Sequence, residues 1–180
     1  MSRLLLALLL ALPLPALARE WQVDPAGSTL GFRGTYQDEA FEGRFGKFDA
    51  AISYDPANLA SARFVVTVDL ASADTGSSER DETLQGGDFF ATSKFPQARF
   101  TTTTFSGAGA TVKAQGNLTL RDITRPVVLT VRFTPQGADG ATLDVDTTLA
   151  RKDFGLGTSD DWADIGSDVP VHAHLVLKAK

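Results

Sequence analysis

Hydrophobic and polar residues alternate along most of the chain beyond residue 20. The alternation is clearest over residues 62–70, 112–120, 127–133, 143–149 and 171–178. In the first of these stretches one parity holds Phe64, Val66, Val68 and Leu70, and the other includes Arg63, Thr67 and Asp69. Since successive side chains of a β-strand point to opposite faces, the pattern predicts strands with one buried and one solvent-exposed face.

Weaker alternation marks three further stretches, residues 28–33, 41–55 and 98–105. The parity of the aromatic positions changes between Phe45 and Phe48, across Gly46, which predicts one strand that carries a bulge. Gly, Pro, Asn and Asp residues between the stretches indicate turns. Short strands separated by such turns favour an all-β sandwich or barrel in a single domain.

One segment, residues 76–96, interrupts the alternation. We expect Ser77 or Ser78 to cap a short helix that ends at Gly86, and Asp88 to cap a second turn. The segment is polar apart from Leu84 and Ala91 and three aromatic residues, Phe89, Phe90 and Phe95. Because these rings need an apolar environment, we expect the excursion to close one end of a barrel.

The first eighteen residues have a different composition from the rest. A basic start at Arg3, an apolar run over residues 4–12 and the small-x-small triplet at 16–18 predict a cleaved signal peptide. The run is shorter than the ~20 residues that a membrane-spanning helix needs. We therefore expect residues 1–18 to direct export to the periplasm and residues 19–180 to form the folded domain.

Charge and composition narrow the chemistry. The chain carries 17 Lys and Arg against 22 Asp and Glu, has no Cys and contains two His. An acidic chain disfavours nucleic-acid binding, and the lack of Cys excludes disulfides and thiol chemistry. No glycine-rich nucleotide-binding motif follows a strand, and no Gly-x-Ser-x-Gly elbow is present. We expect no enzyme activity and no cofactor.

The two histidines lie two residues apart in one alternating stretch. His172 and His174 would share a face, and Asp144 or Asp146 on another strand would be needed to complete a metal site. A solvated strand face explains the same pattern more simply, so we predict no metal site.

Aromatic residues dominate the predicted buried positions. Phe32, Phe64, Phe100 and Phe133 have inward parity, and Phe45 and Phe48 flank the predicted bulge. Small residues also have inward parity, namely Ser28, Thr102, Ala114, Gly116 and Ala173, and would leave volume that larger residues would fill. The pattern alone leaves open whether the interior is a solid core or a cavity for an apolar ligand.

Read in order, several motifs resemble the YceI-like family of exported lipid-binding proteins. They are Trp21-x-x-Asp24, Phe41-x-Gly43-x-Phe45, Arg80-Asp81-x-x-Leu84 with Asp88-Phe89-Phe90, Phe95-Pro96-x-Ala98-x-Phe100, the run from Gly116 to Val127, and Arg151-x-Asp153-Phe154-Gly155-x-Gly157. The resemblance covers residues 20–180 and implies a lipocalin-like antiparallel barrel of about eight strands around an isoprenoid or another long-chain amphiphile.

The resemblance leads to a hypothesis for the ligand site. We expect the apolar chain of the lipid to contact Phe32, Phe45, Phe48, Phe64, Val66, Phe89, Phe90, Phe100, Leu118 and Phe133. Arg80 and Asp81 are the candidates for contact with its head group. Many members have His where this chain has Gly27, and another His within the turn that reads Thr35-Tyr36-Gln37 here, which implies a different head group.

The partners follow from the same resemblance. The ending that contains Trp162 is similar to a branch often encoded beside or fused to membrane cytochromes, which implies a quinone-type lipid and transient contact with a membrane or a membrane cytochrome. The oligomeric state, a dimer included, stays open. The alternatives are a stress-response or assembly protein that acts through its outer surface and, less favoured, an enzyme with His172 or His174 as base.

Overall fold

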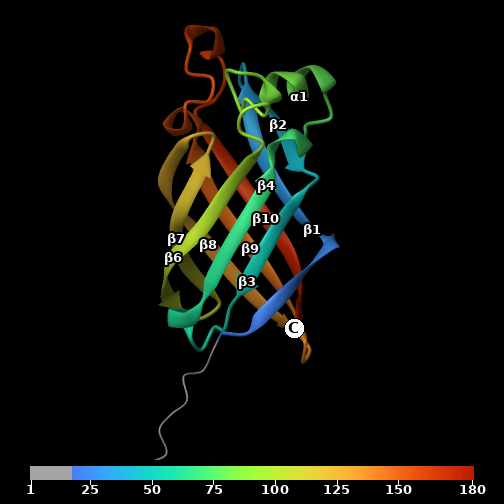
Figure 1. The fold of residues 1–180 in the computed structure, drawn as a ribbon, viewed down its shortest axis with the longest axis vertical. Helices are drawn as coiled ribbons and strands as arrows, with labels where there is room; N and C mark the ends of the chain where they lie inside the picture. The colour runs from blue at the N-terminus through green and yellow to red at the C-terminus, as the bar shows by residue number, and fades with distance from the viewer. Residues whose placement is uncertain (1–17) are drawn as a thin grey trace, which may run out of the picture.

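The computed structural model describes residues 18–180, which form a barrel of antiparallel strands with a cap at one end (Figure 1). Residues 1–17, most of the predicted signal peptide, lie outside the described residues. The strands are β1 (Glu20–Tyr36), β2 (Glu39–Phe45), β3 (Phe48–Ser53), β4 (Arg63–Asp69), β5 (Ala73–Asp74), β6 (Gln97–Ala108), β7 (Thr111–Leu120), β8 (Ile123–Gln136), β9 (Gly140–Ala150) and β10 (Asp168–Ala179).

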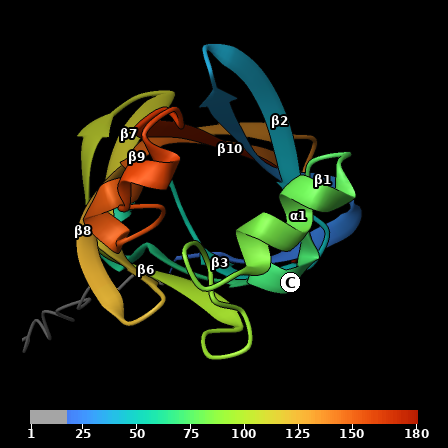
Figure 2. The ribbon, with the colours of Figure 1, turned by 90° about the horizontal axis from the view of Figure 1, so that it is seen from above.

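The sheet closes because its first and last strands pair. Eight strands follow one another around the barrel in the order β1, β3, β4, β6, β7, β8, β9, β10, and β10 returns to β1 from Trp21↔Ala179 to Phe32↔Val171. Figure 2 views the closed barrel from above, from the capped end. The predicted lipocalin-like barrel is therefore confirmed, and every strand of the barrel is antiparallel to its neighbours.

β1 is long enough to pair with two strands along one edge, while β10 pairs with its other edge. Its lower part pairs with β3 at Glu20 and Trp21, and its upper part pairs with β2 from Gly31 to Tyr36. The expected single strand over residues 41–55 is thus wrong, because the chain leaves β1 at Gly46 and returns to a different part of the barrel as β3. Two backbone hydrogen bonds fix the chain between β2 and β3. Gly46 N donates to the Ser72 carbonyl, and Asp69 N donates to the Lys47 carbonyl. Bulges occur elsewhere, in β1 and in β6.

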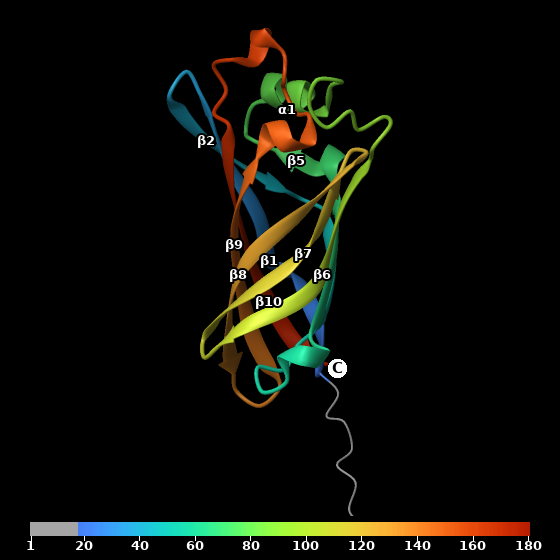
Figure 3. The same ribbon diagram turned by 90° about the vertical axis from the view of Figure 1, so that its left-hand side faces the viewer.

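Three segments form the cap, which lies at the upper end in Figures 1 and 3. They are α1 (Ser78–Gln85), residues 86–95, and residues 151–166, which include the 3-10 helices η3 (Arg151–Phe154) and η4 (Asp160–Trp162). Two further 3-10 helices, η1 (Leu59–Ser61) and η2 (Leu70–Ser72), flank β4. Across residues 18–180, no helix has the length and apolar character needed to cross a bilayer.

The predicted helix is confirmed in its details. Ser77 is the N-cap and accepts a hydrogen bond from Arg80 N, and the helix ends at Gly86. The segment after it differs from the expectation, because residues 87–94 form hydrogen-bonded turns and the Asp88 carboxylate accepts a hydrogen bond from the indole of Trp162 instead. Phe89 and Phe90 are buried within the cap, as expected, whereas Phe95 is half-buried and lies 5.8 Å from the Arg121 guanidinium.

Candidate binding cavity

The lower end of the barrel is filled by aromatic side chains. Tyr54 lies at the centre, with ring centroids 5.8 Å from Phe64, 5.9 Å from Phe105 and 5.1 Å from Phe133. Trp21 packs against Phe133 at 5.4 Å and donates its indole hydrogen to the Tyr54 carbonyl at 2.9 Å. Burial, with Asp55 nearby, raises the pKa of Tyr54 above its ordinary value. We call this group, Trp21, Tyr54, Phe64, Phe105 and Phe133, the aromatic floor.

Higher in the barrel, phenylalanine rings lie along the wall. A Cβ placed on Gly43 would come within 2.3 Å of the Phe32 ring, and one on Gly34 within 2.4 Å of the Phe41 ring. These are cross-strand pairs of β1 and β2, so each ring covers the glycine opposite it. The Phe100 ring covers Gly116, which lies diagonally across from it on β7, since Gly116 is opposite Thr102 in the register. Because the rings lie over glycines, they leave the centre of the barrel open.

The resulting space is a cavity of about 600 Å³ between the aromatic floor and the cap. That volume lies in the ordinary range for small-molecule sites. Aliphatic and aromatic side chains of β1, β3, β4, β6, β9 and β10 form most of its wall. The buried residues Ile52, Phe64, Leu143 and Leu175 are part of this lining.

A buried arginine organises the cap. Arg151 is 3% exposed, and its guanidinium donates hydrogen bonds to the carbonyls of Leu156, Gly157, Trp162, Ile165 and Gly166. Burial lowers the pKa of Arg151 from its ordinary value, yet the five carbonyl acceptors leave the side chain fully engaged. Arg151 therefore ties residues 151–166 together through their backbone, while Phe89, Phe90, Phe154 and Leu156 form an apolar cluster beside it.

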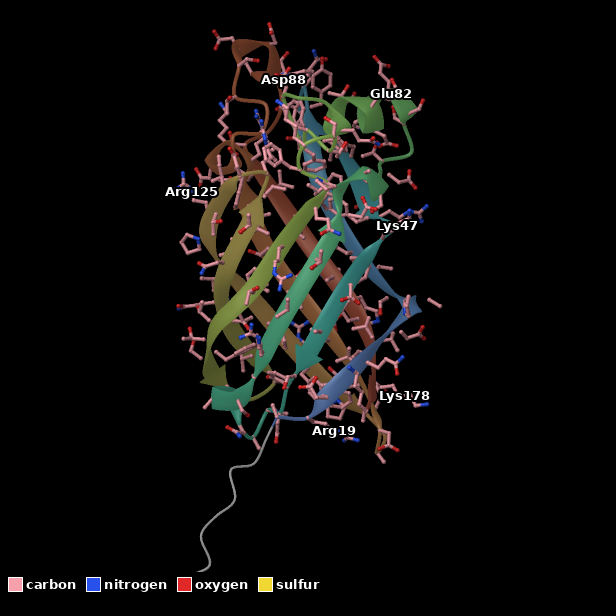
Figure 4. The ribbon with its side chains drawn as sticks, in the orientation of Figure 1. Arg19, Lys47, Glu82, Asp88, Arg125 and Lys178 are labelled. Carbon is pink, nitrogen blue, oxygen red and sulfur yellow. The ribbon has the colours of Figure 1, made fainter. Side chains whose placement is uncertain are left out.

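The two halves of the cap are joined above the cavity. The Trp162 indole donates to the Asp88 carboxylate at 3.1 Å, and its ring meets Phe89 edge-on at 5.0 Å. Phe90 reaches down to Phe45, with centroids 6.1 Å apart. Figure 4 places Asp88 and Glu82 at this end, opposite Arg19 and Lys178.

The polar part of the cavity lining comes mainly from α1. Ser77, Glu79, Arg80 and Thr83 line the cavity beneath the helix, and the Arg80 guanidinium lies 4.4 Å from the centre of the Phe41 ring. Arg80 Nε donates to the Thr75 hydroxyl at 3.0 Å. The cavity thus has an apolar body, and its capped end carries the cations of Arg80 and Arg151 beside the acidic residues Glu79 and Asp161.

Asp81 occupies a different position. Its carboxylate accepts from Thr75 N at 2.9 Å and from the Thr75 hydroxyl at 2.6 Å, and it is absent from the cavity lining. Asp81 therefore orients the threonine that holds Arg80, rather than facing the cavity.

The structure brings together most of the residues that we expected to contact the apolar chain of a lipid. Nine of them line the cavity: Phe32, Phe45, Phe48, Phe64, Val66, Phe89, Phe90, Phe100 and Leu118. Phe133 instead packs into the aromatic floor below it. Its parity is inward, as read from the sequence, but its height along β8 sets it against Trp21 and Tyr54.

The small inward residues do not create the cavity in the expected way. Ala114 is fully buried in the core beside the floor, and Gly116 is covered by Phe100. The hydroxyl of Thr102 accepts from Phe64 N, and that of Ser28 accepts from Val176 N. Of the five, Ala173 is the one that lines the cavity.

Sequence reasoning missed other residues of the site. Arg151 was visible only as part of a motif, and its role depends on carbonyls that the chain folds back over it. Leu30, Tyr36, Phe41, Leu84, Phe154 and Leu156 also line the cavity. Gly27, one of the two departures from the family pattern, is not in the lining, whereas Tyr36, at the other departure, is.

The histidines lie on the outside of the barrel. His172 Nδ1 is 2.8 Å from Asp146 Oδ1, and His174 Nδ1 is 2.7 Å from Asp144 Oδ1, in the register of β10 with β9. Within residues 18–180, no three His, Cys, Asp or Glu side chains form a group that could hold a metal ion.

Comparison with known proteins gives a consistent picture. The model of the YceI-like domain matches residues 21–177. A UPF0312 protein of Vibrio cholerae is 34% identical over 160 residues, which is 84% of this chain and 85% of the relative, and one of Shewanella baltica is 36% identical over 165 residues, 87% and 86% of the two chains.

Solved structures show the same fold. The crystal structure of BcnA from Burkholderia cenocepacia superposes with a TM-score of 0.81 at 29% identity, over 86% of this chain and 99% of that one. A polyisoprenoid binding domain from Saccharophagus degradans superposes with a TM-score of 0.70 at 18% identity, over 90% and 99% of the two chains.

Proposed function

Because this chain belongs to the YceI-like family, we propose that it is a non-enzymatic carrier of a long-chain amphiphilic lipid, of isoprenoid or quinone type. The observation that carries the proposal is the apolar cavity of about 600 Å³ between the aromatic floor and the cap. The polyisoprenoid binding domain from Saccharophagus degradans shares the fold and supports this class of ligand.

The energetics of the cavity favour an apolar occupant. Burial contributes roughly 0.8 kcal/mol per methylene group, so a chain of about ten carbons gains about 8 kcal/mol before ordering costs are subtracted. That corresponds to about micromolar affinity, and longer chains gain more. Affinity should therefore depend mainly on the length of the apolar chain.

The head group is proposed to lie beneath α1. Arg80 supplies a cation there, held in place by Thr75 and the Phe41 ring. A carbonyl, hydroxyl or phosphate oxygen is the natural partner for its N–H groups. Asp81 is proposed to act through Thr75 rather than by touching the lipid.

Export is part of the proposal. The predicted signal peptide would deliver residues 19–180 to the periplasm, where a carrier can exchange lipid with a membrane or a membrane cytochrome. N-terminal sequencing of protein recovered from the periplasm tests this, and a chain that still begins at Met1 would contradict it.

The first experiment identifies the ligand directly. Protein purified from its own periplasm is extracted with organic solvent, and the extract is analysed by mass spectrometry. We expect a long-chain species at a stoichiometry near one per chain. An empty extract, together with failure to take up added ubiquinone or undecaprenol, would favour the protein that acts through its outer surface.

A pair of variants tests whether the cavity is the site. Phe100→Asp introduces a charge into the cavity wall, whereas Arg99→Asp places the same charge on the exposed face of β6 one residue away. Ubiquinone binding should be lost in Phe100→Asp and retained in Arg99→Asp, with circular dichroism confirming that both fold. Unchanged binding in a folded Phe100→Asp protein would refute the cavity as the site.

A further inference from the structure

The wall of the barrel is incomplete between β8 and β9. The two strands pair from Gln136↔Gly140 to Thr130↔Asp146, and the pairing stops there, toward the capped end. Both strands continue: β8 stays paired with β7 as far as Ile123, and β9 stays paired with β10 as far as Ala150. We call the unpaired stretch between residues 125–129 and 147–150 the seam.

The chemistry of the seam keeps the strands from pairing. The Val128 carbonyl points toward β9, since it accepts a hydrogen bond from the Thr147 hydroxyl at 3.0 Å. Residues two apart in a strand direct their backbone groups to the same neighbour, so Pro126 also presents its backbone nitrogen toward β9. Proline has no N–H to donate, and it is typical of strand edges for that reason.

Few contacts cross the seam. The Thr147 hydroxyl bridges it at its lower end, and Arg125 Nε donates to the Asp153 carbonyl at 3.2 Å at its upper end. Figure 4 labels Arg125 at this height on the wall. Both contacts use one side chain each and are solvent-exposed, whereas a paired stretch of the same length would use several backbone hydrogen bonds.

The seam lies between two hollows. Outside the barrel, a groove of about 1020 Å³ runs across β8, β9, β10, β1 and β2. Val127, Thr147, Leu149 and Phe154 line both this groove and the inner cavity. Val128, beside them, is an exposed hydrophobic residue, 50% accessible on the outer face.

We propose that the seam is the route by which the apolar chain of the ligand enters and leaves the cavity. The inference rests on the proposed lipid-carrier function. The alternative route, between the two halves of the cap, requires breaking the bond from Trp162 to the Asp88 carboxylate, the backbone bond from Gly157 N to the Asp88 carbonyl and the contact between the Trp162 and Phe89 rings. The seam is crossed instead by side-chain hydrogen bonds, from Thr147, from Arg125 and, just above them, from Arg121 Nη1 to the Gly155 carbonyl.

A cross-link across the seam tests the route. If the register of β8 and β9 is extended, Val128 lies opposite Thr148. In V128C/T148C these two positions are joined by a disulfide or by dibromobimane, in a chain that has no other cysteine. The matched control is T134C/T142C, which joins the same two strands where they are already paired.

The readout is the rate at which cis-parinaric acid, a fluorescent long-chain fatty acid, leaves each protein for an excess of phosphatidylcholine vesicles. We expect the cross-linked seam variant to release the probe at least about tenfold more slowly than the control, and reduction or omission of the cross-linker to restore the rate.

A second variant works in the opposite direction and needs no cross-link. Thr147→Val keeps the shape of the side chain and removes the hydroxyl that bridges the seam. Release should become about fivefold faster, the factor that one hydrogen bond of ordinary net strength is worth. Equal rates in the wild type, both cross-linked proteins and Thr147→Val would overturn the seam as the route while leaving lipid binding intact. Failure of the wild type to bind the probe, ubiquinone and undecaprenol would overturn the carrier function itself, and the route with it.

Discussion

The two halves of the barrel use the same amino acid for opposite purposes. In the lower half, Phe64, Phe105 and Phe133 meet Tyr54 and Trp21 at the barrel axis and fill it. In the upper half, Phe32 and Phe41 lie flat against the wall and leave the axis open. Both halves contain inward aromatic residues, so the presence of aromatic residues alone does not distinguish a core from a cavity.

The residue that lies opposite each ring on the adjacent strand accounts for the difference. Phe32 is opposite Gly43, and Phe41 is opposite Gly34, so each ring folds down over a position that has no side chain. The floor residues have no glycine beneath them and stack on one another instead. A cavity in this fold is therefore specified by glycines that accept rings as much as by the rings themselves.

The largest expected effect is a loss of stability when the central ring of the aromatic floor is removed. Tyr54→Ala removes the ring that three phenylalanines contact, and truncation of a buried large aromatic residue costs about 3–5 kcal/mol in the free energy of unfolding. Urea unfolding monitored by tryptophan fluorescence measures the loss. Phe32→Ala is the matched substitution in the upper half, and it should cost markedly less because its ring already borders a cavity. Equal costs would contradict the division of the barrel into a filled and a hollow half.

The second-largest expected effect is a local loss of stability in the cap. Arg151→Met leaves five carbonyls without their donor, and each buried unsatisfied group costs about 1–3 kcal/mol when water cannot replace the partner. We expect hydrogen exchange to become fast over residues 151–166 while the strands around Tyr54 keep their protection. Arg125→Met, which removes one exposed hydrogen bond to the neighbouring Asp153 carbonyl, is the control. Loss of protection throughout the barrel would mean that the cap and the floor are one cooperative unit.

A smaller effect should follow from turning a wall ring toward the axis. In Gly43→Ala the new Cβ would clash with the Phe32 ring, so we expect the ring to move toward the cavity that it lines. If the ring displaces about two methylene groups of ligand, affinity falls by about 1.6 kcal/mol, or about fifteenfold. Titration with cis-parinaric acid measures this. The double variant Gly43→Ala/Phe32→Leu should recover most of the affinity, and a failure to recover would show that the glycine acts in another way.

The smallest expected effect is a pH dependence of the free energy of unfolding that arises from Tyr54 in the aromatic floor. Burial raises the pKa of Tyr54 in the folded state, so the unfolded chain loses this proton first as the pH rises past the ordinary value of 10.0. The stabilisation from the neutral phenol is complete below that pH and is lost above it, with a slope of at most about 1.4 kcal/mol per pH unit. Urea unfolding on either side of this pH should show a steeper fall in the wild type than in Tyr54→Phe. Identical slopes would mean that Tyr54 ionises as easily in the folded protein as in the unfolded chain.

The alternation predicts most of the strands because each has one buried and one exposed face, whereas the choice of a barrel over a sandwich came from the family resemblance. The same periodicity cannot tell how high along the barrel a residue lies, which is why Phe133 was assigned to the ligand and is found in the floor. It also cannot show that β1 changes partner between β3 and β2, since that depends on pairing distant in sequence. Arg151 was missed for the same reason: its acceptors come together only when residues 156–166 fold over it.

The two ends of the described chain lie together at the end of the barrel opposite the cap. Lys180 N donates to the Glu20 carbonyl at 3.1 Å, and Arg19 forms an ion pair with Asp139 in the turn between β8 and β9. β10, with twelve residues, spans about 40 Å from there toward the cap. A linker, a surface attachment or a fused partner joined at either terminus would therefore hold the barrel by its base, with the cap and the upper wall projecting away from the point of attachment.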